Sequence, residues 1–142
     1  MSKTELHMPG NLNSAAEKKA FVMEAFDTLF NKRDYKAAES YWSPDYVQHS
    51  AHIAPGREGL FDLVRALPAG HRHESGLAAA EGDLVFLQSR YSGTGQPRAL
   101  ITIDIVRISN GLLAEHWDVW QMEASATESK SGLPMFGARF PD

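Results

Sequence analysis

Two aspartates lie inside apolar segments of this chain, and their type and spacing suit acid–base chemistry. Asp104 lies in the β-branched run of residues 99–108, and Asp118 lies between two tryptophans in residues 112–122. A carboxylate in an apolar segment is paired, turned to solvent, or functional. Two carboxylates close together in a poorly solvated site raise at least one pKa, as a general acid or base working near neutral pH requires.

The turn between these two segments decides whether the acids share a face of the hairpin. A two-residue loop of Asn110 and Gly111 places them on opposite faces, whereas a three-residue loop that begins at Ser109 places Asp104 opposite His116 and Asp118 opposite Thr102. We prefer the second register because it collects the ionisable groups on one face, with Thr102, Asp104, Val106, His116, Asp118 and Trp120. The acids would then be diagonal neighbours, on the order of 7–8 Å or less between their Cβ atoms. A solvated or salt-bridged role stays open for both acids.

Aromatic side chains with polar tips extend this candidate site. Trp42, Tyr46 and Trp120 each carry a group that needs a hydrogen-bond partner, so we interpret them as the lining of a pocket. Phe136 belongs to an apolar cluster at residues 133–137 that could dock back onto the domain.

Composition limits both the class of protein and its chemistry. The chain has 142 residues, of which 43% are hydrophobic and 23% charged, as expected for one globular domain. Its net charge of −4 argues against nucleic acid and against a polybasic membrane contact. The absence of cysteine excludes thiolate catalysis and cysteine-bound metals. The first residues lack the apolar pattern of a signal peptide and no apolar run is long enough to span a membrane, so we expect a cytoplasmic protein.

No motif indicates a cofactor or a metal. No helix follows Gly93-Thr94-Gly95, so this segment is not a nucleotide-binding loop. His71 and His73 share one face of a predicted strand, but a third ligand at a recognisable spacing is missing. We therefore expect neither a cofactor nor a metal.

The pattern of apolar residues predicts three helices followed by strands. The first helix starts at a capping box formed by Ser14 and Glu17, the second follows Asp34 and carries Trp42, and the third starts at Pro55-Gly56. Four antiparallel strands are predicted over residues 71–80, 84–92, 99–108 and 112–122. This order indicates an α+β domain at residues 14–122, with a flexible arm at residues 1–13 and a tail at residues 123–142 that docks back in part.

Three groups of segments together resemble the SnoaL-like polyketide cyclases of the nuclear transport factor 2-like superfamily. The segments are Tyr46-Val47-Gln48-His49 with Pro55-Gly56-Arg57-Glu58-Gly59, Glu81-Gly82-Asp83-Leu84-Val85, and Asp104-Ile105-Val106-Arg107 with Asn110-Gly111 and Glu115-His116-Trp117-Asp118. The similarity covers roughly residues 15–137 and is greatest to the branch predicted to catalyse aldol-type condensations.

The resemblance implies a fold, a partner and an assembly. The fold would be a cone-shaped, cystatin-like α+β barrel, in which a strongly curved antiparallel sheet wraps around three N-terminal helices and a deep apolar pocket. The pocket would take a small apolar ligand or substrate. Homodimers are common in the family, and here they would form through the outer sheet face, which carries Ile101, Ile103, Ile105, Trp117 and Val119.

The resemblance also implies roles for the candidate residues. Asp118 matches the general acid/base of an aldol closure that needs neither metal nor cofactor, and Asp104 matches a second polar position that is often histidine. The segment that contains His49 contributes to the pocket, so His49 or Asp104 would polarise a carbonyl oxygen. His116, Trp42, Tyr46, Trp120 and Phe136 would bind the substrate.

We therefore expect a cofactor-free acid/base enzyme, an aldol-type cyclase or an isomerase, that acts on a small apolar carbonyl compound. Two alternatives stay open. One is a module that binds a small ligand without turnover, and the other is a hydrolase or dehydratase of the same fold, because the fold alone does not determine function.

Overall fold

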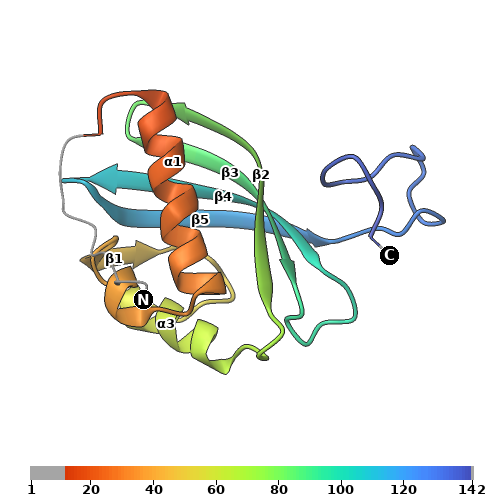
Figure 1. The fold of residues 1–142 in the computed structure, drawn as a ribbon, viewed down its shortest axis with the longest axis horizontal. Coiled ribbons are helices and arrows are strands. Elements are labelled where there is room, and N and C mark those ends of the chain that lie inside the picture. Colours follow the sequence, from red (N-terminus) through yellow and green to blue (C-terminus); the bar gives the residue numbers. More distant parts are fainter. Residues whose placement is uncertain (1–11, 142) are drawn as a thin grey trace, which may run out of the picture.

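The computed structural model describes residues 12–141 as one curled five-stranded sheet with helices packed on its inner face (Figure 1). The helical segments are α1 (Ala15–Phe26), the π-helical turn η1 (Asp27–Asn31), α2 (Tyr35–Ala38) and α3 (Gly56–Ala66). The strands are β1 (Trp42–Gln48), β2 (Arg72–Glu81), β3 (Leu84–Ser92), β4 (Leu100–Ser109) and β5 (Leu112–Met122), and they lie in the order β1-β5-β4-β3-β2. Residues 1–11 of the predicted arm lie outside the described residues.

The α+β class is confirmed, and the N-terminal boundary of α1 follows from its capping box. The Glu17 backbone N–H donates to Ser14 Oγ at 3.0 Å, and the Glu17 carboxylate accepts from the Ser14 backbone N–H at 3.2 Å. At the other end of this helical segment, Asn31 exchanges two hydrogen bonds with the backbone of His73, which ties η1 to β2. These contacts hold the long helix against the sheet and place Phe26 and Phe30 on its inner side.

The sheet differs from the prediction in one strand. Residues 42–48, predicted as the end of a helix and a short extended segment, form β1, which pairs with β5 in parallel. The sheet is therefore mixed and curled, and it does not close into a barrel. Pro44 has no backbone N–H to donate, and β1 tolerates it because this strand lies at the edge of the sheet.

The register of the β4–β5 hairpin corrects the predicted pairing but confirms that the acids share a face. Asn110 and Gly111 both have positive φ, 52° and 73°, as a tight two-residue loop requires. The ladder then shifts by one residue, because Ile108 pairs with Leu113 whereas Arg107 pairs with Glu115, which leaves Ala114 as a bulge. Asp104 consequently lies directly opposite Asp118, and not opposite His116 as predicted.

Part of the predicted tail contacts the outer face of the sheet. Gln88 Nε2 donates to the Met135 carbonyl oxygen at 2.9 Å. The ring of Phe136 packs against Gly76, so that a Cβ added there would lie 2.6 Å from a ring carbon. Gln88 is an outer-face residue, since its neighbours Leu87 and Ser89 are fully buried on the inner face. Within residues 12–141, the structure has no helix that is long and apolar enough to cross a membrane.

Candidate active site

A cavity of about 330 Å³ lies between the inner face of the sheet and the helices. Its walls are mainly apolar and aromatic, and they include Phe26, Phe30, Trp42, Tyr46, Leu60, Leu63, Leu67 and Tyr91. Where β4 and β5 pair, the lining is polar and contains Thr102, Asp104, His116 and Asp118. An apolar chamber with a few convergent polar groups is typical of a small-molecule site.

Asp104 is the most enclosed polar group of the site, with 2% of its surface exposed. Its Oδ2 accepts hydrogen bonds from Tyr91 Oη and Thr102 Oγ1, both at 2.9 Å, and its Oδ1 lies 2.8 Å from His116 Nε2. Burial acts to raise the pKa of Asp104, but the hydrogen bond and charge of His116, with the hydroxyls of Thr102 and Ser89, lower it below its ordinary value. Asp104 therefore favours the ionised form more than an ordinary aspartate does, and its Oδ1 orients His116.

His116 is held by acceptors at both ring nitrogens. Its Nδ1 lies 2.6 Å from Gln48 Oε1, and the Ser50 backbone N–H donates to the same oxygen at 3.0 Å. The backbone donor identifies this atom of Gln48 as the oxygen, so His116 Nδ1 must donate to it. Its Nε2 faces the Asp104 carboxylate. Both contacts are satisfied when each ring nitrogen carries hydrogen, as in an ion pair of His116 with Asp104.

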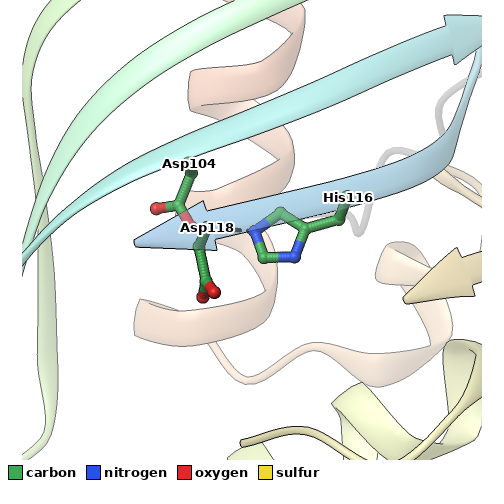
Figure 2. Close-up of side chains that lie close together, drawn as sticks. All are labelled: Asp104, His116 and Asp118. Carbon is green, nitrogen blue, oxygen red and sulfur yellow. Dashed lines mark hydrogen bonds and ion pairs between the residues drawn. The ribbon is translucent and has the colours of Figure 1, made fainter. Parts of the chain in front are cut away.

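Asp118 has a different environment from Asp104, although the two residues are paired across the strands. It is partly buried, and its side chain points from β5 to the same side as Asp104 and His116 (Figure 2). Burial raises the pKa of Asp118, and the charge of Asp104 adds to this effect, against the opposing influence of His116, Ser50 and His52. The paired acids are therefore unlike: Asp104 stays ionised, and Asp118 takes up a proton more readily than an ordinary aspartate.

Tyr46 places a neutral hydroxyl group in the same cavity. Its Oη accepts a hydrogen bond from Gln48 Nε2 at 3.2 Å, and burial raises the pKa of the phenol further above its ordinary range. Trp42 is fully buried in the wall beside it, whereas Trp120 is 39% exposed and its ring lies 5.2 Å from that of His52. Trp120 and His52 therefore lie where the cavity meets solvent.

The structure thus brings together six of the predicted site residues, Asp104, Asp118, His116, Trp42, Tyr46 and Trp120, around one cavity. It places the other two elsewhere. His49 is exposed on the outer side, where its Nε2 lies 2.7 Å from Glu115 Oε2 and its ring stacks on Trp117 at 4.8 Å. Phe136 packs against Gly76 in the docked tail and does not line the cavity.

The sequence analysis missed the residues that position the charged groups. Gln48, Ser50 and Tyr91 contact them through hydrogen bonds or line the same cavity, whereas Thr102, which donates to Asp104, was placed on the correct face without a role. The signal for Gln48 was present, because strand alternation from the buried Tyr46 turns Gln48 inward and His49 outward. Tyr91 gave no comparable signal, since its contact with Asp104 depends on how β3 aligns with β4.

The two acids and His116 also form the only cluster of possible metal ligands among residues 12–141 with the spacing of a metal site. One ligand atom from each of Asp104, His116 and Asp118 lies within 4.8 Å of the others. A divalent cation there would have to displace the hydrogen bond between His116 Nε2 and Asp104 Oδ1. The absence of a metal from the working site stays a prediction.

Comparison with solved structures finds the same fold in several bacterial proteins. AclR, a candidate hydroxylase from Streptomyces galilaeus, is 27% identical, with 77% of this chain and 81% of that chain covered and a TM-score of 0.61. IdmH, a candidate polyketide cyclase from Streptomyces antibioticus, is 21% identical, with coverage of 73% and 91% and a TM-score of 0.59. A candidate ketosteroid isomerase from Kribbella flavida is 13% identical, with coverage of 89% and 97% and a TM-score of 0.66.

The sequence itself matches a family model, although a search of curated proteins found no match. The model describes the SnoaL-like domain and covers residues 23–116, well over half of the chain. The matched range contains Asp104 and His116 and ends two residues before Asp118. Family membership therefore does not depend on Asp118. The chain therefore belongs to the SnoaL-like family of the nuclear transport factor 2-like superfamily.

Proposed function

We propose that this protein is an acid/base enzyme that removes and returns a proton at the carbon beside a carbonyl group of a small apolar compound. The observation that carries the proposal is the unlike pair of facing acids, in which Asp104 is held ionised by three donors and Asp118 has a raised pKa in the same cavity. Two neighbouring groups whose environments separate their pKa values are typical of acid–base sites.

Asp118 is the proton acceptor in this proposal. A carboxylate with a raised pKa is a stronger base than an ordinary aspartate, and it retains the proton long enough to return it to carbon or oxygen. Asp104 is not suited to this role, because its oxygens are already occupied by Tyr91, Thr102 and His116. Asp104 instead holds the His116 ring in place.

Tyr46 and His116 stabilise the negative charge that develops on the carbonyl oxygen. Tyr46 Oη accepts from Gln48, so its own hydrogen is free to donate to an enolate oxygen. His116, paired with Asp104 and hydrogen-bonded to Gln48, lies beside Asp118 and in its ion-paired form favours an anion over the neutral ketone. These two residues take the role that the sequence analysis gave to His49 or Asp104.

The walls of the cavity define the class of substrate. Leucine and phenylalanine side chains from α1, η1 and α3 surround the polar group, so the body of the substrate is apolar. A candidate polyketide cyclase and a candidate ketosteroid isomerase have the same fold, which supports the proposal that the substrate is a carbonyl compound that contains or forms a ring. An aldol-type ring closure and an isomerisation both start with the proton transfer proposed here.

Exchange of carbon-bound hydrogen tests the proposal without knowledge of the natural substrate. 2-Tetralone, an apolar ketone small enough for the cavity, is incubated with the protein in heavy water, and NMR follows deuterium uptake beside the carbonyl. We expect the wild-type protein to accelerate uptake and Asp118→Asn to lose the acceleration by about 100-fold or more, the usual effect of a general base.

The control is Asp45→Asn, which makes the same chemical change at an exposed residue of β1. This variant should accelerate exchange as the wild type does. Uptake that is equally fast in Asp118→Asn and in the wild type would contradict the proposed role of Asp118. Binding of 2-tetralone without any acceleration in the wild type would instead indicate a ligand-binding module.

A further inference from the structure

His71, the residue directly before β2, is a buried polar residue that the proposed reaction does not use. It lines the same cavity as Asp118, and only 7% of its surface is exposed. Its Nδ1 lies 3.1 Å from the Ser92 carbonyl oxygen. Its Nε2 is the one buried side-chain polar atom within residues 12–141 that has no hydrogen-bond partner.

The contact with Ser92 determines which nitrogen of His71 carries hydrogen. A carbonyl oxygen only accepts, so Nδ1 is the donor and Nε2 presents its lone pair. Burial lowers the pKa of His71, and the charge of Arg33 lowers it further, so the ring is neutral near neutral pH. Nε2 is therefore an acceptor, and a buried acceptor without a donor is costly to fold.

The surrounding side chains leave the cavity as the source of a donor. The ring of His71 lies between aromatic neighbours, with Phe30 at 5.8 Å and Tyr91 stacked on it at 6.1 Å, and neither ring face offers a hydrogen. Nδ1 is fixed toward Ser92 and His71 lines the cavity, so we take a molecule in the cavity as the donor that remains for the buried Nε2.

We propose that His71 Nε2 accepts a hydrogen bond from a hydroxyl or N–H group of the ligand, so that the cavity selects an apolar molecule with such a donor away from its carbonyl. Tyr91 lies between the acids and His71, because its hydroxyl donates to Asp104 and its ring stacks on His71. A ligand whose carbonyl lies at Asp118 and whose donor lies at His71 would therefore extend along Tyr91. The inference takes its cavity from the proposed function, but it concerns binding and needs no turnover.

Two pairs of probes separate the hydroxyl from the carbonyl. 6-Hydroxy-2-tetralone is compared with 2-tetralone, and 5,6,7,8-tetrahydro-2-naphthol is compared with tetralin, which has no oxygen. Dissociation constants are measured by calorimetry or by fluorescence. In each pair we expect the hydroxyl compound to bind about tenfold tighter to the wild type, as one buried hydrogen bond gives.

The variants identify His71 as the source of this preference. His71→Phe keeps an aromatic ring but has no acceptor, and it should reduce the preference to about onefold to twofold, whereas His71→Gln restores an acceptor and should recover part of it. Leu63→Val, an apolar change in the wall of the same cavity, should weaken both members of a pair equally. A wild type without a hydroxyl preference, or a preference unchanged in His71→Phe, would overturn the inference.

A measurement on the unaltered protein decides the matter even if His71→Phe does not fold. Nitrogen NMR of protein with labelled histidines reports the bare Nε2 of His71, whose signal should move when tetrahydro-2-naphthol is added and stay in place with tetralin. An Nε2 signal that responds equally to both compounds would refute the hydrogen bond. Because the naphthol has no carbonyl, failure here is separate from failure of the exchange reaction with 2-tetralone.

Discussion

At the scale of single residues, the site depends on two aspartates that face each other and differ in everything except type. Asp104 is surrounded by donors and a cationic ring, whereas Asp118 is partly buried and has Asp104 as a like-charged neighbour. The first environment favours the anion and the second opposes it. The pair thereby supplies both a fixed negative charge and a proton acceptor within one cavity.

This difference predicts opposite effects of the same substitution on stability. Asp104→Asn removes the partner of a buried histidine and should lower the free energy of unfolding by about 3 kcal/mol or more. Asp118→Asn removes a charge that the fold disfavours and should leave stability near pH 7 unchanged or raise it. Urea denaturation of both variants measures the difference, and equal losses in the two would contradict it.

The lowered pKa of the buried His73 determines part of the pH dependence of stability. Its ring is buried, its Nε2 lies 2.9 Å from Ser89 Oγ, and burial lowers its pKa from 6.5 to about 4. As pH falls from 6.5 to about 4, the unfolded chain binds a proton that the folded protein rejects, so stability present above this window is lost within it. The contribution of His73 to this loss is about 3 kcal/mol at most.

Urea denaturation across this pH window tests the role of His73. His73→Gln, which has no titrating ring, should lose less stability than the wild type between the two limits. His71 also has a lowered pKa and titrates in the same direction, so some loss should remain in the variant. Identical pH dependence in the wild type and His73→Gln would show that His73 does not contribute.

At the scale of elements, the sequence predicted most strands but neither the first strand nor the pairing of the last two. The ranges 84–92 and 112–122 match β3 and β5, because their apolar and aromatic residues follow directly after the turns at Gly82-Asp83 and Asn110-Gly111. β1 was missed because it is short, polar and contains Pro44. The bulge at Ala114 was missed because alanine does not distinguish a bulge from a regular pair.

The shared face of the two acids was nevertheless predicted correctly, and two compensating features explain why. The loop has two residues instead of three, which alone would place Asp104 and Asp118 on opposite faces, and the bulge then turns β5 by one residue. Sorting residues by polarity identified the face even though the assumed loop was wrong. The inner residues His71 and Tyr91 lay beyond this reasoning, since their roles depend on contacts between distant strands.

The packing of the Phe136 ring against Gly76 is expected to attach the tail to the sheet. A side chain at this position would meet the Phe136 ring and Gln88 Oε1, each at 2.6 Å from the new Cβ. Gly76→Val should therefore detach the segment around Phe136 and make the tail sensitive to limited proteolysis, while the cavity still binds 2-tetralone. Phe136→Ala should have a similar effect, and Leu133→Ala, at a 68% exposed residue, should not. A tail that stays protected in both Gly76→Val and Phe136→Ala would contradict this attachment.

At the scale of the whole molecule, the outer face of the sheet remains the candidate for an interface between two copies. Val119 is 70% exposed and Ile103 is 40% exposed, and the two face each other on β4 and β5. Ile101, predicted for the same surface, is buried within the chain, so the available patch is narrower than the sequence suggests. A homodimer through this patch stays a prediction, because the family resemblance and the exposed pair are its only support.

Light scattering after size exclusion tests this assembly. The wild type should elute as a dimer, and Val119→Glu should convert it to monomers because it places a charge in an apolar contact. Ala66→Glu adds the same charge at an exposed position of α3, away from the sheet, and should leave the dimer intact. A monomeric wild type, or a dimer that survives Val119→Glu, would exclude this interface.

The central claim is that the facing aspartates have separate roles, and a titration of their carboxyl groups tests it most directly. Carbon NMR of protein with labelled aspartates, assigned through Asp104→Asn and Asp118→Asn, reports the pKa of each group. We predict that Asp118 titrates above the ordinary aspartate range and Asp104 below it. Two ordinary pKa values, or the reverse order, would contradict the assignment of Asp118 as the base and Asp104 as the residue that holds His116.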